Sequence, residues 1–411
     1  MPSLLSDRKE SSYSTSSSHI ATPSALSELE EFDEILERIG RSAFISTRRS
    51  TTSDTICESS EHSNDENCTF FIGEGFDSFP VVENPISVTP LPGENIQRVH
   101  RDDFHIVCKI GRGGYSDVHM VLDHNRQKRA LKALSLSRIK NSDEFVIAAI
   151  DLAMEAKILS ELNHENIIQL KGISSSRFSR SYTEITDEGF FLVFDLLNDV
   201  LNERLTRWRK SERQLSALEN KWTFTGIQKV NTKRMHERMT NVALGIVKGM
   251  MYLHEREIVM RDLKPANVGF DEEGNVRLFD FGMARRLEDC DPNEICGSPR
   301  YMPPEIMAGN GYSFGADVYS FGVILYEICA LKLAFDGILN NCRDLREFNR
   351  LVIEENLRPK LKKISCPSTK KLIEDCWHGD PAQRPSFEEI YQRILGIVAC
   401  NPAAPPQQCT E

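Results

Sequence analysis

One polar segment of this chain, followed by a second after a short hairpin pattern, constrains the fold more than any other feature. The first segment is Met260-Arg261-Asp262-Leu263-Lys264-Pro265-Ala266-Asn267, and Asp280-Phe281-Gly282 begins eighteen residues after Asp262. Between them, the short segments 268–270 and 276–279 flank the turn-forming residues 271–275, which is the pattern of a β-hairpin. A hairpin there returns Asp280 to the side of Asn267.

The polar side chains of these two segments suit the handling of phosphate groups. Asn267 and Asp280 would present two oxygen ligands to Mg²⁺, which binds few protein ligands and several phosphate oxygens. Asp262 would be placed to accept a hydroxyl proton, and Lys264 to neutralise charge on a transferred group. Any one such aspartate is more often structural or on the surface, but this order and spacing favour the phosphate-handling interpretation.

A glycine-rich loop, residues 111–118, precedes these segments in the chain. It follows a strand pattern whose alternate residues share one face: Phe104, Ile106, Cys108 and Ile110. The loop itself reads Gly111-Arg112-Gly113-Gly114-Tyr115-Ser116-Asp117-Val118. Glycine allows a backbone to approach a phosphate closely, although such a loop alone is a weak signal.

The residues after the glycine-rich loop predict a second strand, not a helix. Val118, Met120 and Leu122 alternate into a polar turn, and the chain returns through Ala130-Leu131-Lys132. A dinucleotide-binding loop requires a helix directly after its glycines, so a nucleotide-dependent oxidoreductase is disfavoured. We expect the loop to be the tip of a strand pair that folds over a nucleotide.

Lys132 lies in an apolar strand pattern, where an unpaired buried charge is costly; a surface lysine at a strand edge is the alternative. The next segment predicts a helix that opens near Asn141, with Glu144 placed for a capping box. Glu155 lies along the apolar stripe of this helix. We expect a Lys132–Glu155 ion pair that holds the ammonium against the α- and β-phosphates of ATP. Alternatively, Glu155 pairs with Lys157 or faces solvent.

These motifs resemble the signature set of the protein kinases. They occur in the family's order: the glycine-rich loop, Ala130-Leu131-Lys132, Glu155, Arg261-Asp262 to Asn267, Asp280-Phe281-Gly282 and Pro303-Pro304-Glu305. The resemblance covers about Phe104 to Ile397. It implies an α+β, two-lobed protein kinase fold, with a small β-rich N-lobe that carries one helix and a larger helical C-lobe. It also implies Mg²⁺-dependent transfer of the γ-phosphoryl group of ATP to a protein.

Two further parts of the sequence indicate the class of kinase. Lys264-Pro265 and the run Gly297-Ser298-Pro299-Arg300-Tyr301 resemble the serine/threonine class, whose substrates are protein serine and threonine hydroxyls. The run from Cys376-Trp377 through Asp380-Pro381 to Arg384-Pro385-Ser386-Phe387 resembles the tyrosine-kinase-like branch of that class.

The resemblance implies roles for individual residues. The implied catalytic residues are Asp262, Lys264, Lys132 and Glu155, and the implied metal ligands are Asn267 and Asp280. The implied ATP-binding residues are Ile110, Gly111, Arg112, Gly113, Gly114, Tyr115, Ser116, Asp117, Val118, Ala130, Lys132, Asp195 and Leu197. Asp317 is expected to anchor the backbone of the catalytic loop (residues 260–267), Arg384 to pair with Glu305, and Phe194 to stand as a gatekeeper.

Two residues depart from the family pattern. Met260 stands where a histidine is usual, and Ser116 where a glycine is usual. Methionine can keep the packing under Phe281 but loses a hydrogen bond, so we expect weaker positioning of Asp280; Ser116 is small enough to be tolerated. The alternative function is a pseudokinase-like scaffold that binds nucleotide or partners without phosphotransfer.

The activation segment, residues 283–296, contains no serine, threonine or tyrosine. In kinases with an arginine before the catalytic aspartate, a phosphate in this segment usually pairs with that arginine. We hypothesise that an acidic residue supplies a permanent anion to Arg261, the candidates being Glu288, Asp289, Asp291 and Glu294. The alternative is a solvated acidic turn, with Arg261 paired elsewhere.

The regions outside the motifs differ in composition. Residues 1–95 are rich in serine and threonine and too poor in apolar surface to offset the cost of ordering, so we expect disorder. Within them, the apolar spacing over 26–39 predicts a helix that forms on docking to a partner or, alternatively, a solvated and partly helical tail. The serine-rich residues 174–188 predict a hairpin excursion between two strands.

We place the kinase domain at 104–397. Its expected parts are an N-lobe at 104–195, a C-lobe at 196–397, a polar insert at about 204–235 between two helices and, beyond the domain, a disordered tail at 398–411.

Charge and hydropathy exclude several classes of function. Lysine and arginine total 50 against 61 aspartates and glutamates, a net charge of -11, which argues against nucleic-acid binding. The most apolar long stretch, 319–335, contains Glu327 and Lys332, so it predicts a buried core helix and no membrane insertion. The eleven cysteines form no CxxC pair. We therefore expect a cytoplasmic protein and leave nuclear access open.

Overall fold

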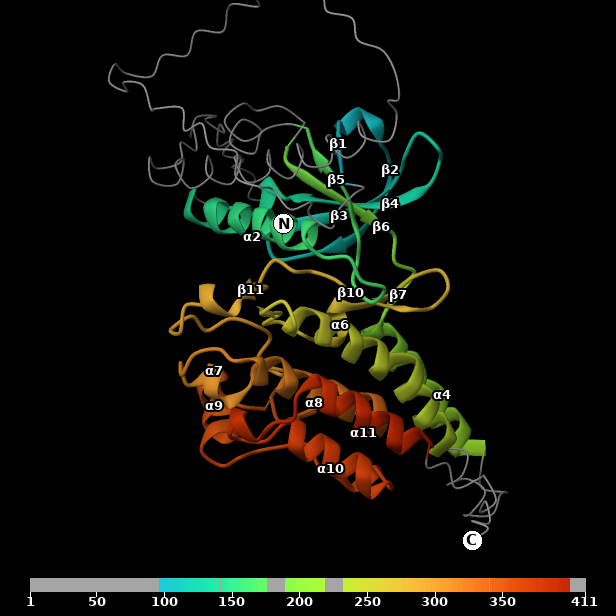
Figure 1. Ribbon diagram of the computed structural model, residues 1–411, viewed down its shortest axis with the longest axis vertical. Coiled ribbons are helices and arrows are strands. Elements are labelled where there is room, and N and C mark those ends of the chain that lie inside the picture. The colour runs from blue at the N-terminus through green and yellow to red at the C-terminus, as the bar shows by residue number, and fades with distance from the viewer. Residues whose placement is uncertain (1–95, 141, 176–188, 219–231, 340, 400–411) are drawn as a thin grey trace, which may run out of the picture.

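The computed structural model describes residues 96–140, 142–175, 189–218, 232–339 and 341–399. Within them, a small lobe built on a β-sheet lies against a larger, mainly helical lobe (Figure 1). This is the two-lobed α+β arrangement that the motifs predicted. Among the described residues, no helix combines the length and the apolar character needed to cross a membrane.

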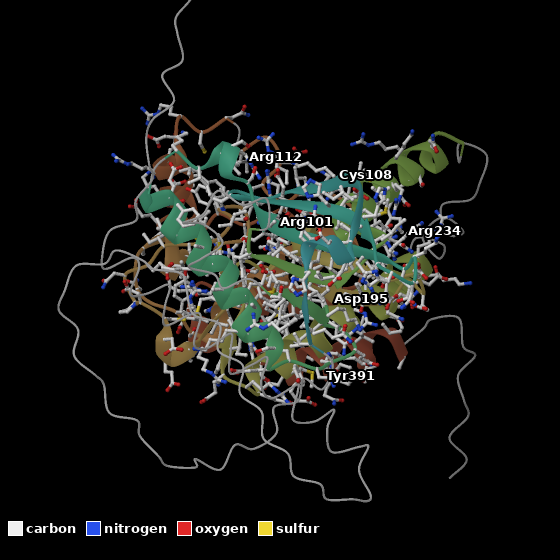
Figure 2. The ribbon with its side chains drawn as sticks, turned by 90° about the horizontal axis from the view of Figure 1, so that it is seen from above. Arg101, Cys108, Arg112, Asp195, Arg234 and Tyr391 are labelled. Atoms are coloured by element: carbon white, nitrogen blue, oxygen red, sulfur yellow. The ribbon has the colours of Figure 1, made fainter. Side chains whose placement is uncertain are left out.

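The small lobe consists of a six-stranded sheet and one long helix, α2 (Ser142–Ser160). In sheet order, the strands are β1 (Gln97–Val99), β5 (Leu170–Ser174), β6 (Phe191–Asp195), β4 (Lys128–Leu134), β3 (Ser116–Leu122) and β2 (His105–Arg112). Neighbouring strands are antiparallel, except β1 and β5, which are parallel. Seen from above, α2 runs along one side of the sheet (Figure 2). It therefore covers one face of the strands that carry the predicted nucleotide site.

The predicted strand pair around the glycine-rich loop is confirmed, because β2 and β3 pair from Arg112 and Asp117 outwards. The expectation of a single apolar face on the first strand is wrong. Register shifts interrupt the pairing of β2 at two points, and such irregularities turn successive side chains out of strict alternation. Phe104 packs edge-on against Phe191 at 6.3 Å, whereas Ile106 and Ile110 are 42% and 46% exposed.

The folded unit begins before residue 104, the start we predicted for the domain. Strand β1 adds an edge to the sheet, and the Arg98 guanidinium donates to the backbone oxygen of Ser174 at 3.0 Å. Val99 packs on a small apolar cluster that includes Val121 and Leu131. A three-residue strand is too short to leave a readable alternation in the sequence, so this element was missed.

The large lobe is built around helix α8 (Phe314–Ala330), in which every residue from Ala316 onwards is buried. This confirms the predicted core helix, which ends at Ala330 because Leu331 adopts a left-handed backbone conformation. Other helices of the described part of this lobe include α4 (Leu201–Leu218), a π-helical turn (Met239–Ala243), α6 (Leu244–His254), α7 (Pro304–Met307), α9 (Leu345–Ile353), α10 (Pro367–Cys376) and α11 (Phe387–Ala399). The short strands of the large lobe are β7 (Asp199–Val200), β8 (Ile258–Val259), β9 (Val268–Phe270), β10 (Val276–Leu278) and β11 (Arg285–Arg286).

The prediction of a polar insert at about 204–235 is wrong for its first half, residues 204–218. Helix α4 is continuous over that part, Leu205 is fully buried, and Trp208 packs against the core. The guanidinium of Arg204 lies 3.3 Å from the centre of the Phe270 ring. Long basic side chains can cover apolar surface with their stems. The many charges of this segment therefore concealed, in the sequence, the face of the helix that packs against the core.

Other expected segments lie outside the described residues. They are 1–95, with the helix predicted at 26–39, most of the excursion at 174–188, residues 219–231 of the insert, and 400–411 of the tail. The expected tail began at 398, but α11 continues to Ala399. The strands that flank the excursion, β5 and β6, are antiparallel neighbours as predicted.

Candidate active site

The catalytic loop and the hairpin that follows it bring the two predicted metal ligands together. Strands β9 and β10 pair antiparallel, with Val268 opposite Leu278. The N–H of Phe279 then donates to the backbone oxygen of Asn267 at 3.1 Å. Asp280 therefore lies directly beside Asn267, as the sequence predicted.

The backbone of the catalytic loop is held from below by Asp317 of helix α8. Its two carboxylate oxygens accept the N–H groups of Met260 and Arg261 at 2.9 and 3.0 Å. Arg261 and Asp280 both have φ near 64°, a conformation that costs a non-glycine residue about 1–3 kcal/mol. The bonds from Asp317 oppose this strain at Arg261, which confirms the predicted anchoring contact.

Lys132 on β4 joins both lobes through two carboxylates. Its ammonium lies 2.7 Å from Glu155 Oε2 on α2 and 2.6 Å from Asp280 Oδ1. The other oxygen of Glu155 accepts the N–H of Phe281 at 3.3 Å. The Lys132–Glu155 pair is confirmed, and the two alternatives for Glu155 are wrong because this residue is 2% exposed and bound to Lys132. The second contact, to Asp280, was not predicted.

The protonation of this cluster follows from burial and from the charges within it. Burial by itself would lower the pKa of Lys132, but the carboxylates of Asp280 and Glu155 outweigh it and raise the pKa. Burial raises the pKa of Glu155, while Lys132 lowers the pKa of Asp280. Asp280 has the most exposed side chain of the three, at 43%. It is therefore an ionised carboxylate at the edge of the cleft.

Asp262 is the centre of a second polar cluster. Its Oδ2 lies 2.5 Å from the ammonium of Lys264, and its Oδ1 accepts the N–H of Ser298 at 2.9 Å. Lys264 also donates to the Ser298 hydroxyl at 3.0 Å. The amide nitrogen of Asn267 donates to the backbone oxygen of Asp262 at 3.0 Å and to its Oδ2 at 3.3 Å. The carboxylate of Asp262 is thus fixed by donors from three directions.

The residues present fit a magnesium ion. The amide nitrogen of Asn267 is bound to Asp262, which leaves its oxygen as a ligand atom, and Asp280 contributes a carboxylate. Within the described ranges, no group of three or more histidine, cysteine, aspartate or glutamate side chains could hold a metal ion alone. Two oxygen ligands suit Mg²⁺, which keeps most of its coordination for phosphate oxygens and water.

A cavity of about 100 Å³ connects the glycine-rich loop with both polar clusters. Tyr115 and Ser116 line it, together with Lys132, Asp262 and Asp280. The loop thus lies over the same space that the predicted catalytic and metal-binding side chains border. This places Lys132, Glu155, Asp262 and Asp280, all predicted from separate segments, around one cavity.

Of the other residues that the resemblance implies for ATP binding, Ala130 lies on β4, Asp195 at the end of β6 and Leu197 shortly after it. Ala130 pairs with Phe194 across β4 and β6, and Phe194 is buried. The carboxylate of Asp195 contacts Arg129 and lies 3.2 Å from the ammonium of Lys171. The side chain of Leu197 packs against Gly269, whose missing side chain leaves room for it. Ile110 and Gly111 lie on β2 and Val118 on its partner β3, where the two strands enter and leave the loop.

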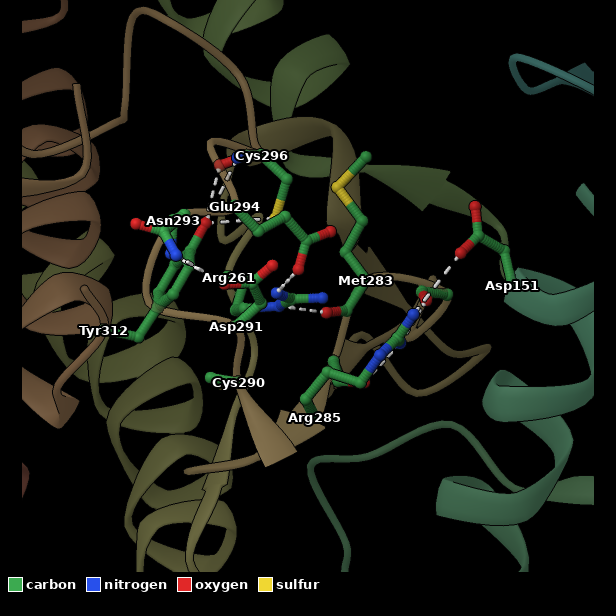
Figure 3. Close-up of polar contacts among 12 residues, drawn as sticks. Asp151, Arg261, Met283, Arg285, Cys290, Asp291, Asn293, Glu294, Cys296 and Tyr312 are labelled. Carbon is green, nitrogen blue, oxygen red and sulfur yellow. Dashed lines mark hydrogen bonds and ion pairs between the residues drawn. The ribbon is translucent and has the colours of Figure 1, made fainter. Parts of the chain in front are cut away.

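One acidic residue of the activation segment contacts Arg261 (Figure 3). An Nη1 atom of Arg261 contacts the carboxylate of Glu294, and its Nε donates to the backbone oxygen of Met283 at 2.6 Å. The side chain of Arg261 is only 1% exposed. The contact with Glu294 confirms the hypothesised anion, whereas Asp291 binds the N–H of Asn293 in a local turn.

Several residues that hold this site were not predicted. Arg285 and Arg286 extend from β11 towards helix α2, to Asp151 at 3.5 Å and Glu161 at 2.7 Å. Arg138 contacts the glycine-rich loop from outside. The predicted pair of Arg384 with Glu305 is confirmed, with two bonds of 2.6 and 2.7 Å. For Arg138, Arg285 and Arg286, nothing in the neighbouring sequence indicates which segment the side chain will contact.

Comparison with known proteins agrees with this geometry. The chain is 25% identical over 298 residues to a probable serine/threonine-protein kinase of Dictyostelium discoideum, covering 72% of this chain and 16% of that protein. It is 30% identical over 296 residues to the dual specificity protein kinase pyk3 of the same organism, covering 71% of this chain and 18% of pyk3. It is 27% identical over 310 residues to serine/threonine-protein kinase STY17 of Arabidopsis thaliana, covering 75% and 47%.

The chain thus spans less than half the length of each of these relatives. Residues 104–394 match the protein kinase domain family, which is well over half of the chain. The match begins at the strand that leads into the glycine-rich loop and ends within helix α11. It confirms the membership that the motifs indicated, and the chain belongs to the protein kinase family.

Proposed function

We propose that this chain is a serine/threonine protein kinase, which transfers the γ-phosphoryl group of ATP to serine or threonine hydroxyls of proteins in a Mg²⁺-dependent reaction. The observation that carries the proposal is the contact of Lys132 with both Glu155 and Asp280, at 2.7 and 2.6 Å, in the cavity that Asp262 also lines. One lysine therefore connects helix α2 of the small lobe with Asp280 of the large lobe. Phosphoryl transfer depends mainly on such positioning and on charge stabilisation.

Each polar residue would have a distinct role. Asp262 would orient the substrate hydroxyl and accept its proton as the new oxygen–phosphorus bond forms and the bond to ADP breaks. Lys264, 2.5 Å from Asp262, would neutralise charge on the transferred group. Lys132 would bind the α- and β-phosphates. Asn267 and Asp280 would hold Mg²⁺, which when bound neutralises charge on the phosphate oxygens.

The choice of serine and threonine rests on the contact between Lys264 and Ser298. The lysine bridges the Asp262 carboxylate and the Ser298 hydroxyl. Two of the three relatives described above carry serine/threonine in their names, and one is named a dual specificity kinase. Analysis of which amino acid is phosphorylated tests this part separately.

The pseudokinase-like scaffold was motivated by Met260 and Ser116. Met260 is buried and belongs to the same apolar cluster as Phe281. The backbone of Met260 is held by Asp317 independently of its side chain. The methionine therefore leaves the framework of the catalytic loop in place, which supports the enzyme over the scaffold.

The test is phosphate transfer from Mg-ATP to a generic protein substrate, followed by phosphoamino-acid analysis. Asp262→Asn should lower kcat at least about 100-fold, since it removes the proton acceptor. Glu273→Gln is a matched control, because Glu273 lies exposed at the tip of the β9–β10 hairpin. Chelation of Mg²⁺ should abolish transfer by the wild type. Equal signals from the wild type and Asp262→Asn would instead favour the scaffold.

A further inference from the structure

One arginine outside the residues predicted to bind ATP contacts four residues of the glycine-rich loop. Arg138 follows β4 and precedes helix α2. One of its terminal nitrogens contacts the backbone oxygen of Gly113 and donates to that of Gly114 at 3.1 Å. The other donates to the backbone oxygen of Ser116 at 2.8 Å and contacts the carboxylate of Asp117. The Arg138 side chain is 16% exposed; its bonds to Ser116 and Asp117 are partly buried, whereas those to Gly113 and Gly114 lie at the surface.

The same turn binds the loop at a further point through Ser135. The N–H of Ser135 donates to the backbone oxygen of Tyr115 at 2.8 Å, and its hydroxyl donates to Asp117 Oδ2 at 3.0 Å. Ser135 itself is buried. Four successive backbone oxygens of the loop therefore bind to the turn formed by residues 135–138: those of Gly113, Gly114, Tyr115 and Ser116.

These bonds determine where the N–H groups of the loop point. In a planar trans peptide, the oxygen of one residue and the N–H of the next point in opposite directions. Binding the oxygens of Gly113, Gly114 and Tyr115 to the turn therefore directs the next three N–H groups away from it. Tyr115 and Ser116 line the cavity that contains Lys132 and Asp280. Glycine adopts many backbone conformations, so this loop needs an external restraint to keep one orientation.

We propose that Arg138 is a positioning residue that holds the glycine-rich loop with its backbone N–H groups presented to the phosphates of ATP. This inference rests on the proposed function for the identity of the nucleotide. The planar guanidinium has several donors in a fixed fork, so one side chain can bind successive carbonyl oxygens at once. The ammonium of a lysine has the same charge without that fixed geometry.

A second cation at the loop provides a matched control. The ammonium of Lys109 lies 2.7 Å from Asp117 Oδ2, and its side chain is 43% exposed. Among the contacts of the described residues, it reaches the loop through this carboxylate and not through the backbone oxygens. Lys109→Met removes a positive charge from the same place but leaves the bonds from Arg138 intact.

The experiment compares a ligand that carries phosphates with one that has none. The full chain and its variants are titrated with Mg²⁺ and a non-hydrolysable ATP analogue, and separately with adenosine, by calorimetry. Arg138→Met should raise the Kd of the analogue about tenfold, or about 1.4 kcal/mol, and leave the Kd of adenosine within about twofold. Arg138→Lys should raise the analogue Kd at least about fivefold, because the fork is lost. Lys109→Met should change neither Kd by more than about twofold.

Any of the following three results would overturn the inference. An unchanged analogue Kd in Arg138→Met shows that the contacts do not serve the phosphates. A parallel loss of adenosine binding shows that Arg138 supports the lobe as a whole. Wild-type affinity in Arg138→Lys shows that charge alone is sufficient. Binding needs no turnover, so a wild type that binds the analogue but transfers no phosphate refutes the proposed function and still tests Arg138; a wild type that does not bind the analogue overturns both.

Discussion

The ion pair between Arg261 and Glu294 predicts that this chain needs no phosphate in its activation segment. The guanidinium is buried, with a side chain 1% exposed, and it lies next to Asp262 in the chain, while the side chain of Glu294 is 43% exposed. Arg261 also holds the backbone of Met283, at the other end of the segment. Glu294→Gln keeps the size of the side chain but leaves this buried cation without its carboxylate.

The magnitude follows from the burial of each partner. Removing one partner of a fully buried ion pair costs about 3–5 kcal/mol. The exposure of Glu294 and the hydrogen bond that glutamine still accepts reduce this to about 1–2 kcal/mol. Such a loss is a factor of about 5–30 in the population of the ordered segment. We expect kcat/KM for a protein substrate to fall about tenfold, with an unchanged KM for ATP, because other bonds hold Lys132 and Asp280.

Steady-state kinetics of the full chain check this prediction. Glu288→Gln is the matched control, since Glu288 is an acid of the same segment that has no bond to Arg261 in the part of the chain that the structure describes. Wild-type activity should also persist after phosphatase treatment. Equal kcat/KM values for Glu294→Gln and the wild type would refute the reasoning, as would a sharp loss of wild-type activity after phosphatase treatment.

Two further predictions concern ion pairs of the large lobe. Arg384→Met should lower Tm by about 6 °C or more, because it breaks a buried, two-bond pair with Glu305. The control Arg343→Met, which changes a side chain that is 89% exposed, should shift Tm by less than about 2 °C. Similar shifts for both variants would contradict this prediction. Arg209→Met removes the guanidinium that lies 3.1 Å from the buried Glu327 carboxylate, to which Tyr301 also donates at 3.4 Å. Because Tyr301 lies in the loop that carries Ser298, the KM for a protein substrate should rise about fivefold while that for ATP stays constant; equal changes in both would refute the link.

Local patterns in the sequence carried most of the fold and the centre of the site. The β9–β10 hairpin is a contiguous pattern, so the approach of Asp280 to Asn267 followed from residues 268–279 alone. Lys132 and Glu155 could be paired because each is a charge within an apolar pattern, and a buried charge requires a partner. The acid that binds Arg261 was narrowed to four candidates because the whole segment is only fourteen residues long.

What could not be predicted depends on long side chains and short elements. Arg138 and Arg209 reach segments that are distant in the chain, and nothing in their local sequence indicates the target. Helix α4 was missed over 204–218 because its many charges hid the apolar contacts of Leu205 and Trp208. The register shifts in β2 could not be read either, since a bulge depends on how a neighbouring strand pairs.

The contacts between the lobes suggest how the cleft can both close and release its product. Besides Lys132 and Asp280, two pairs join β11 to the small lobe: Arg285 with Asp151 of helix α2 at 3.5 Å, and Arg286 with Glu161, the residue directly after that helix, at 2.7 Å. Pairs that are partly exposed to water each contribute little, about 0–1 kcal/mol. Two such pairs can bias α2 towards the position in which Glu155 meets Lys132 without locking it there. A kinase must open for nucleotide exchange in every cycle, and weak pairs beside one buried pair combine a defined closed state with that freedom.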